Sequence, residues 1–449
     1  MAMTDFVIIT RSMRARRFST MLTALSVAVA VALLLTLLMM KDAGRAAFER
    51  GTGNVHMVVG RDGTPLQSLL NSVYYAGIPR NPIRWAEFEK LRDAHAPEIP
   101  MPPGIQPGFA IPIQLGDSFK GLPVVATTEA FFTRFEPVAG RPFEFASGEK
   151  FKENFQAVLG SRASRDTGLR VGDKFHVTHG SGLDGHVHDE FEFTVVGVLK
   201  DTGSAHDRAI FTNLNSSWLL HALDRLEREH GHDHGHEGHE HGPDGECLHG
   251  PEISEADLTD ADRLITGVLL RTPTREGRDA SAAMATVFTS LRSDTSLTVA
   301  QPSQEINRLF TIVGAVDKVL IAMAAVVLAG SGVSILLAMY GSMDLRRRQV
   351  AILRVLGCSK GRIFSLVLTE AALIGVIGSA LGIALAFAAG PLIALVMRRQ
   401  LGLFIDPVLP PDLTLLTMVG VIVLAALAGL LPAVMAYRTP VANNLKPLG

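Results

Sequence analysis

Four long apolar stretches constrain the fold of this chain more than any other feature. They cover residues 18–40, 319–343, 363–397 and 415–437. Each is long enough for a helix that crosses the roughly 30 Å of hydrocarbon in a bilayer. Apolar residues make up 47% of the 449 residues and charged residues 19%, a balance that favours a membrane protein with a sizeable soluble part. The sequence therefore predicts an α-helical membrane protein with four transmembrane helices in a one-plus-three arrangement.

The distribution of Lys and Arg predicts the orientation of these helices. Four arginines precede the first stretch and six basic residues occupy the loop at 344–362, whereas the loop at 398–414 holds two. Because short loops rich in Lys and Arg stay in the cytoplasm, we expect the ends of the chain, 1–17 and 438–449, on that side. Residues 41–308 then lie on the opposite side of the membrane, outside the cytoplasm. The first stretch is too long for a signal peptide and no cleavage site follows it, which indicates a retained anchor.

Residues 41–308 carry the pattern of an α+β domain inserted between the first and second helices, with helical stalks at both ends. Thr64 followed by Pro65 predicts a helix N-cap with proline at the first helical position. Short β-type runs separated by glycine and proline fill residues 107–220. Residues 260–272 predict a strand, and residues 280–291 predict a helix.

A low-complexity insertion at 230–249 is rich in histidine and could not build a core. Alternating His-x-His with nearby acids offers overlapping ligand sets for Zn²⁺, Cu²⁺ or Ni²⁺, although a solvated spacer explains the same pattern. All fifteen histidines of the chain lie between His56 and His249. Five histidines outside the insertion either form a second metal site or are merely exposed loop residues: His176, His179, His186, His188 and His206. The candidate metal ligands of the insertion are His230, His232, His234, His236, His239, His241, Cys247 and His249.

The basic segment from Met343 to Glu370 joins the second and third apolar stretches. It is either an amphipathic helix that meets a cytoplasmic partner or a positive-inside anchor and no more. Gly357 suits a helix C-cap. Glu370 is either a proton relay or a structural carboxylate within reach of Arg362 or another loop arginine. The residues assigned to docking are Arg346, Arg347, Arg348, Ile352, Arg354, Val355, Leu356 and Gly357.

A small-residue face on the third stretch is formed by Gly375, Gly378 and Gly382. Such a face lets another helix approach closely. Packing within the subunit and packing across a dimer predict the same pattern.

Several motifs together resemble the MacB/FtsX-like (LolC-type) permeases of ATP-binding-cassette (ABC) systems. FEPVAGRPF, QAVLGSRAS, LRVGDKFHV and FEFTVVGVLKDTGSAHDRAIFTNL are similar to the outside core domain of that family. RRRQVAILRVLGCSKGRIFSLVLTEAALIGVIGSALGIALA and LLPAVMAYRTPVANNLKP are similar to its membrane domain. The resemblance implies a bacterial inner-membrane permease that dimerises, docks a separate ATPase on loop 344–362 and passes stalk motion to a periplasmic domain. Members of the family act on lipoproteins, on peptides or drugs, or on cell-wall hydrolases.

The sequence also limits the chemistry of the chain itself. No G-x-x-x-x-G-K-[ST] loop is present, so ATP is expected on a partner chain. No catalytic motif indicates an enzyme, and the net charge near −2 gives no reason to expect nucleic acid. The expected partners are the ABC ATPase, a second copy of the chain, the bilayer and a periplasmic accessory protein. The rival interpretation is a membrane-anchored metal buffer or sensor without ATP coupling. A secondary carrier is not expected, because the apolar stretches lack the paired charged residues of such carriers.

Overall fold

The computed structural model describes residues 5–97, 101–179, 191–230, 253–279, 281–400 and 407–438. The chain divides into two compact units. The helical unit comprises Met1–Gly44, Ile312–Gln400 and Ile405–Gly449, and the sheet unit comprises Arg45–Thr311 with Leu401–Phe404. Each described buried cluster lies within one of the two units, so each unit has a core of its own.

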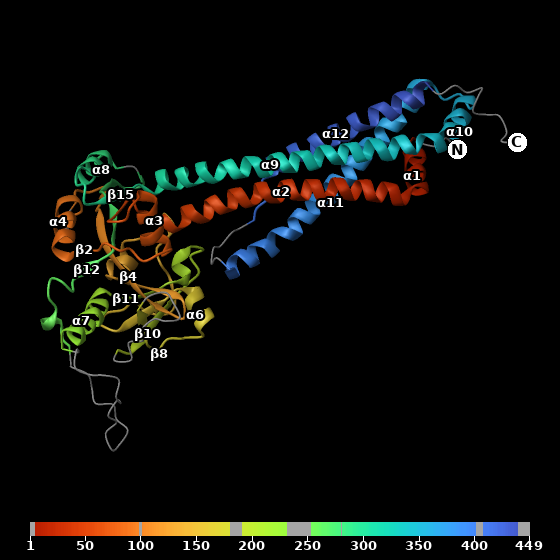
Figure 1. The fold of residues 1–449 in the computed structure, drawn as a ribbon. Coiled ribbons are helices and arrows are strands. Elements are labelled where there is room, and N and C mark those ends of the chain that lie inside the picture. Colours follow the sequence, from red (N-terminus) through yellow and green to blue (C-terminus); the bar gives the residue numbers. More distant parts are fainter. Residues whose placement is uncertain are drawn as a thin grey trace, which may run out of the picture. The chain divides into compact units, whose positions relative to one another are not determined.

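Four helices are long and apolar enough to cross a membrane, which agrees with the four predicted spans. They are longer than their apolar stretches because helix-forming residues continue beyond them; KDAGRAAFERG, for example, holds no strong breaker. Two short helices, α1 and α10, accompany them in the helical unit (Figure 1). The helices are α1 (Asp5–Ala15), α2 (Arg17–Thr52), α9 (Pro302–Gly341), α10 (Met343–Val355), α11 (Lys360–Gln400) and α12 (Pro411–Arg438).

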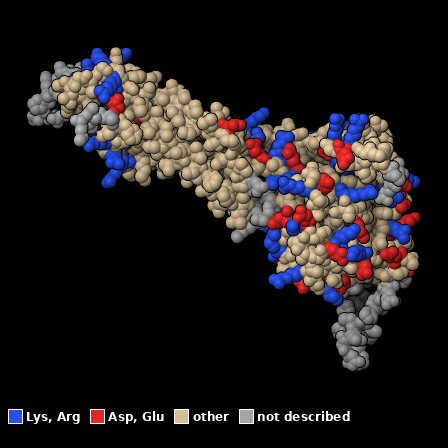
Figure 2. Space-filling model, turned by 180° about the vertical axis from the view of Figure 1, so that it is seen from behind, with Lys and Arg blue, Asp and Glu red and all other residues tan. Residues whose placement is uncertain are grey.

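Charge is distributed unevenly over the helical unit. Figure 2 shows few charged side chains along the long helices and several Lys and Arg at the end of the unit that holds α1 and α10. An apolar surface of this kind is stable against lipid, whereas the basic end suits a cytoplasmic membrane surface. These basic residues are among those from which the orientation was predicted, so the orientation stays a prediction.

The sheet unit is built on one mixed sheet, whose strands follow the order β15-β1-β13-β4-β5-β11-β7-β10-β6. In Figure 1, α3 (Pro65–Tyr74), α4 (Trp85–His95) and α8 (Met284–Ser293) gather about the half with β15, and α6 (Ser161–Thr167) and α7 (Leu214–His230) about the half with β10. The strands along this order are β15 (Thr298–Ala300), β1 (Met57–Gly60), β13 (Gly267–Arg271), β4 (Phe109–Phe119), β5 (Leu122–Thr127), β11 (Ile210–Asn213), β7 (Gln156–Leu159), β10 (Phe193–Leu199) and β6 (Phe145–Gly148).

The strand predictions between residues 107 and 220 are confirmed. In β10 the buried residues alternate with half-buried ones, as expected for a strand with one face on the core. Most neighbours are antiparallel, but β5 pairs with β11, and β7 with β10, in parallel. The shorter strands are β2 (Ile83–Arg84), β3 (Ile105–Gln106), β8 (Lys174–Phe175), β9 (Thr178–His179), β12 (Leu264–Ile265) and β14 (Thr274–Arg275), and α5 (Ala130–Thr133) is a single turn.

Two local predictions can be compared in detail. Thr64 is the N-cap of α3, and its hydroxyl accepts a hydrogen bond from the Gln67 amide at 3.2 Å, as predicted. The strand predicted at 260–272 is instead divided into β12 and β13. The break falls at Thr266, whose hydroxyl donates to the Ile113 carbonyl oxygen at 3.0 Å and accepts from the Leu115 amide at 3.1 Å. These two bonds occupy ladder positions of β4 and allow β12 to pair with β2.

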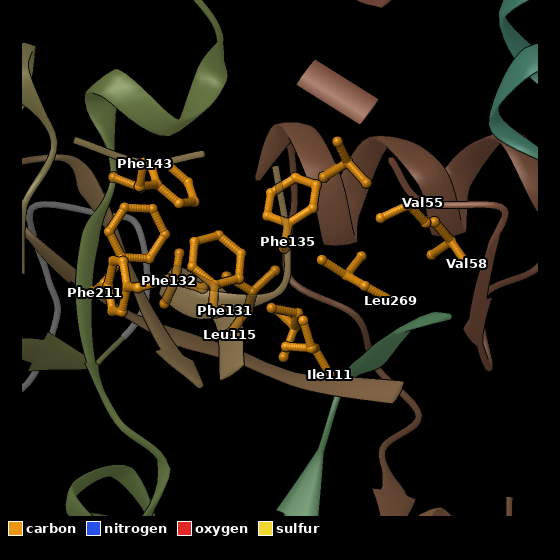
Figure 3. Close-up of a cluster of buried hydrophobic side chains, with 14 of the residues drawn as sticks. Val55, Val58, Ile111, Leu115, Phe131, Phe132, Phe135, Phe143, Phe211 and Leu269 are labelled. Carbon is orange, nitrogen blue, oxygen red and sulfur yellow. The ribbon is translucent and has the colours of Figure 1, made fainter. Parts of the chain in front are cut away.

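A cluster of phenylalanine rings forms the centre of the sheet unit. Phe131, Phe132 and Phe143 pack against Phe211 of β11, and the ring centroids of Phe131 and Phe211 lie 4.9 Å apart (Figure 3). Each well-placed aromatic pair contributes about 0.5–1.5 kcal/mol beyond the burial of its surface. The cluster continues through Leu269 to the start of β1, so the core reaches the place where α2 enters the sheet unit.

Candidate functional site

The predicted basic segment forms the helix α10, and its second half carries an exposed apolar strip. Ile352, Val355 and Leu356 are 45%, 64% and 76% exposed, whereas Val350 and Ala351 are buried. The spacing i, i+3, i+4 places the three exposed residues on one helix face. They are among the predicted docking residues, together with Arg354 in the same turn. The side chains of Arg346, Arg347 and Arg348 lie outside the described part of α10.

The end of α10 is fixed by its glycine. Gly357 has a φ of 93°, its amide donates to the Arg354 carbonyl oxygen at 3.1 Å, and the Cys358 amide donates to the Leu353 carbonyl oxygen at 3.0 Å. This bond pair is the Schellman motif, in which a left-handed glycine closes a helix. The motif sets the direction in which the chain leaves α10 for α11.

Glu370 of α11 is 3% exposed and does not meet the predicted partner Arg362. Nη2 of Arg16, just after α1, donates to Oε1 of Glu370 at 2.6 Å, and the Ser12 hydroxyl donates to the same oxygen at 3.3 Å. Arg362 instead pairs with Asp5 at 2.6 Å. Both ion pairs tie the first residues of the chain to α11 and give Glu370 a structural contact, whereas a role in proton transfer stays a prediction.

The small-residue face of α11 packs inside the chain. A Cβ on Gly378 would lie 2.6 Å from Cβ of Val27 in α2, and one on Gly382 would lie 2.6 Å from Cβ of Val31. A Cβ on Gly375 would lie 2.7 Å from Cβ of Ala425 in α12. Of the two alternatives for this face, contact within the subunit is the one observed.

Helix α9 leaves an apolar seam exposed along the helical unit. Exposed residues recur along α9 after four and three positions alternately, so they lie on one face of the helix. Seven members are between 56% and 71% exposed, and Tyr340 is 49% exposed. We call this row the α9 seam; it consists of Ile312, Val316, Val319, Met323, Val326, Gly330, Val333, Leu337 and Tyr340.

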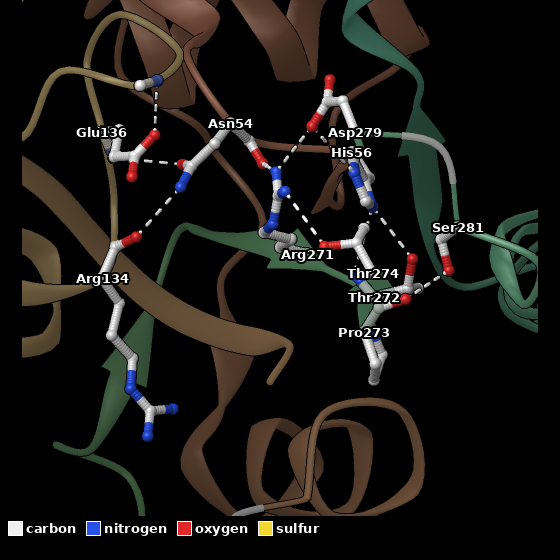
Figure 4. Close-up of polar contacts among 11 residues, drawn as sticks. Asn54, His56, Arg134, Glu136, Arg271, Thr272, Pro273, Thr274, Asp279 and Ser281 are labelled. Atoms are coloured by element: carbon white, nitrogen blue, oxygen red, sulfur yellow. Dashed lines mark hydrogen bonds and ion pairs between the residues drawn. The ribbon is translucent and has the colours of Figure 1, made fainter. Parts of the chain in front are cut away.

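A dense polar joint connects the end of α2 to the sheet (Figure 4). Gly53 has a φ of 51°, and a Cβ there would lie 1.7 Å from the Glu136 carbonyl oxygen, so no other residue fits. The Asn54 side chain donates to the Arg134 carbonyl oxygen at 3.1 Å and accepts from the Glu136 amide at 3.0 Å. Nη1 of Arg271 in β13 donates to the Asn54 carbonyl oxygen at 2.6 Å. Two separate segments, residues 134–136 and β13, therefore hold one helix end.

The joint continues into a buried histidine. Nδ1 of His56 lies 2.9 Å from the Thr272 hydroxyl, and its Nε2 lies 3.6 Å from Oδ1 of Asp279. Asp279 also accepts from Arg271 at 2.9 Å. Burial and the positive charge of Arg271 lower the pKa of His56, which keeps the ring neutral at pH 7.

A second buried histidine contacts the last turn of α2 directly. Nε2 of His206 lies 3.0 Å from the Gly51 carbonyl oxygen, and its Nδ1 lies 2.8 Å from the Tyr75 hydroxyl. A carbonyl can only accept, so Nε2 carries the proton and the Tyr75 hydroxyl donates to Nδ1. Burial lowers the pKa of His206 to about 4 and raises that of Tyr75 well above its usual value.

The comparisons with known families cover both units. The family model described as MacB-like periplasmic core domain matches residues 20–236, which contain Gly53 and Asn54 of the polar joint as well as His206. The model described as FtsX-like permease C-terminal matches residues 321–441, which contain α10, α11 and α12. The chain belongs to the MacB/FtsX-like family of ABC transporter permeases. A comparison with curated proteins found no match.

Membership makes this permease a membrane protein and a subunit of an ABC transporter, and permeases of these families work with an ABC ATPase. Such subunits are usually not catalytic themselves. The helices and the inserted α+β unit have the order that the sequence predicts.

The predicted metal ligands of the permease lie outside the described residues, except that α7 ends at His230. The proposed second site is not formed around His206, because both of its ring nitrogens already have partners. His176 faces the Phe191 carbonyl oxygen at 3.2 Å. Within the described ranges, no three His, Cys, Asp or Glu side chains are grouped so that they could hold a metal ion.

The described residues on the two sides of the histidine-rich insertion are bound to each other. Arg225 of α7 donates to both oxygens of Asp262, at 2.8 and 3.0 Å. Burial would raise the pKa of Asp262, but the hydrogen bonds from Arg225 and Thr259 lower it to about 2. The described segments before and after the insertion are therefore joined by this ion pair.

Sequence reasoning missed several residues of the permease, chiefly Arg16, Asn54, Tyr75 and Arg271. The run Gly51-Thr52-Gly53-Asn54 after a long helical pattern is a helix-end signal that marks the joint. The bonds of Arg16 to Glu370 and of Arg271 to Asn54 could not be predicted locally, because these partners lie far away in the sequence.

Proposed function

We propose that this permease is driven by a separate ABC ATPase that docks on α10. The observation that carries the proposal is the exposed apolar strip of Ile352, Val355 and Leu356 on a helix whose end is fixed by Gly357. Exposed large apolar residues beside basic ones are typical of a surface that meets another protein. The strip would receive motion from the ATPase, and the Schellman motif would pass it to α11.

The polar joint supports an output for this motion. Helices α2 and α9 contribute residues to both units, and in the sheet unit Arg45 of α2 donates to Asn307 of α9 while Phe48 packs on Phe310 with centroids 5.8 Å apart. A helix end held by Asn54, Arg271 and His206 cannot move without the sheet. The permease would thus transmit work to its outside domain instead of forming a pore.

The docking proposal is tested by replacing the strip in the full chain. Val355→Ser with Leu356→Ser should abolish co-purification of the ATPase and the permease's effect on its ATPase rate, while membrane insertion is unchanged. The control is Leu427→Ser, since Leu427 is 61% exposed but lies on α12. Unchanged ATPase binding by the double variant would refute docking at this strip.

The transmission of motion to the sheet unit is tested at the polar joint. Asn54→Ala removes two side-chain bonds and should lower transport while the stimulated ATPase rate persists. Asn81→Ala is the control, because Asn81 is exposed and makes a single long bond to Arg61 at 3.4 Å. Parallel loss of both activities, or of neither, would argue against a transmission role for Asn54.

We propose a second copy of the chain as the partner of the α9 seam. The support is the length of this continuous exposed apolar row, together with the family resemblance, which implies a permease that dimerises. The proposed arrangement is a homodimer in the bacterial inner membrane with the sheet units in the periplasm.

We also propose that the histidine-rich insertion binds Zn²⁺ or a similar ion in a regulatory role. The support is its sequence of alternating histidines with nearby acids and Cys247. Titration of the full permease with Zn²⁺ should give at least one ion per chain, and deletion of 230–249 should remove it. If the permease keeps its full function in the absence of any ATPase partner, the rival interpretation, a metal buffer or sensor, is favoured. The proposed roles of the transporter are envelope export, lipoprotein handling or metal homeostasis.

A further inference from the structure

The sheet unit contains a cavity of about 500 Å³ that the transport mechanism does not use. Its size falls in the range of small-ligand sites, roughly 300–1,000 Å³. The lining residues come from α4, β4, the segment after β5, and the start of α7, and include Trp85 and Trp218. These are the two tryptophans of the whole chain.

The position of the cavity follows from the parallel pair of β5 and β11. Thr127 and Asn213 are register partners at the carboxyl ends of these strands. The residues that follow, Thr128 after β5 and Asn215 in α7, line the cavity. A crevice outside the carboxyl ends of neighbouring parallel strands is where open α/β sheets place ligands.

One wall of the cavity is a rigid aromatic corner. The rings of Trp85 and Trp218 meet edge to face with centroids 4.9 Å apart, and Phe88 lies 4.7 Å from Trp85. Nε1 of Trp218 donates to the Leu264 carbonyl oxygen at 2.7 Å, which fixes the ring. Trp218 and Phe88 are almost fully buried, whereas Trp85 is partly exposed. A flat ring can pack against such a corner by offset or edge contacts.

The remaining polar residues of the lining are electrically balanced. Thr128, Asn213 and Asn215 supply neutral hydroxyl and amide groups. The two charged lining residues have partners in the chain, since Glu129 pairs with Lys150 and Arg92 pairs with Asp93 at 2.9 Å. No surplus charge is therefore left on the described lining for an ionic ligand, and a neutral ligand with hydrogen-bonding groups fits best.

We propose that this cavity binds an aromatic ring that carries neutral amide groups, as in an aromatic residue of a polypeptide or a free aromatic amide. The ring would pack against the corner of Trp85 and Trp218, and the amides would reach Thr128 and Asn213. The site is separate from ATPase docking and from the histidine-rich insertion, and it gives the sheet unit a ligand of its own.

The test uses tryptophan fluorescence of the full chain, because both reporters line the cavity. The probe is N-acetyl-4-nitrophenylalaninamide, whose nitrophenyl ring quenches tryptophan on contact. Saturable quenching that N-acetylphenylalaninamide reverses and N-acetylalaninamide does not is the expected result. A pentapeptide with the nitrophenylalanine flanked by glycines separates the sources: binding of the peptide indicates a polypeptide ligand, and its exclusion indicates a free amide.

A variant that fills the cavity provides the second test. Ala110→Phe places a ring in the lining and should weaken probe binding about tenfold or more. Ala86→Phe is the matched control, because Ala86 is exposed on α4 outside the lining. Quenching of the wild-type protein that rises linearly without saturation, or equal binding by a folded Ala110→Phe variant, would overturn the proposal.

Discussion

Nε2 of His206 donates to the carbonyl oxygen of Gly51 at 3.0 Å, so a fully buried imidazole holds the last turn of the first long helix. Three phenylalanine rings surround it, with Phe131, Phe135 and Phe143 centred 5.2–5.9 Å away. The contact requires a neutral ring that donates from Nε2 and accepts at Nδ1. Protonation would remove the acceptor from Tyr75 and place a charge in an apolar core.

The stability of the sheet unit should therefore depend on pH through His206. The folded pKa of about 4 is below the unfolded value near 6.5, so the unfolded state binds the extra proton between these values. Stability should fall by up to about 1.4 kcal/mol per pH unit as the pH drops through this window. His206→Gln removes the titrating ring and should show a shallower fall. Tryptophan-detected melting of the full chain measures both; equal pH dependence would rule out His206 as the cause.

The Arg16–Glu370 pair should be strongly coupled, because Glu370 is 3% exposed and Arg16 19%. Arg16→Ala leaves a buried carboxylate and should destabilise the helical unit by about 3–5 kcal/mol. The double variant Arg16→Met with Glu370→Leu removes both charges and should lose less. Thermal stability in detergent for the singles and the double gives the coupling energy. Additive losses would mean that the two groups act independently.

Two glycines of the helical unit predict opposite effects of the same substitution. Gly382→Ala places a Cβ 2.6 Å from Cβ of Val31 and should destabilise by about 1–3 kcal/mol. A Cβ on Gly420 would meet no atom of the described residues within 4 Å beyond its own helix backbone, so Gly420→Ala should stabilise α12 by about 0.5–1 kcal/mol. Melting temperatures of the two variants should shift in opposite directions. A shift of Gly382→Ala to higher temperature would contradict the close packing of α11 on α2.

The α9 seam predicts which helix meets its copy. In a background with Cys247→Ser and Cys358→Ser, Val319→Cys and Val326→Cys should form disulfide-linked dimers rapidly under mild oxidation. Val423→Cys on α12 is the control, since Val423 is 52% exposed and apolar but outside the seam. Gel mobility without reductant reports the dimer. Equal rates at the two helices would indicate random collision and no specific α9 pairing.

Sequence reasoning predicted the helices and most strands because their signals are local. A 20-residue apolar run or an alternating strand pattern such as that of β10 encodes burial in neighbouring residues. The Schellman end of α10 was also visible in Gly357, because a left-handed position favours glycine. The same local reasoning predicted one strand at 260–272, which was wrong, because Thr266 bonds to β4, about 150 residues earlier in the chain, and divides the segment into β12 and β13.

The sequence by itself determined the composition and order of the parts of this permease: four apolar helices, a basic connection and an inserted α+β domain. Only the tertiary structure decided that Glu370 pairs with Arg16 instead of Arg362, that Gly378 and Gly382 face α2, and that the two tryptophans share one cavity. The physical reason is distance along the chain. Hydropathy and turn preferences act over a few residues, whereas ion pairs, close helix contacts and cavities depend on which segments folding brings together.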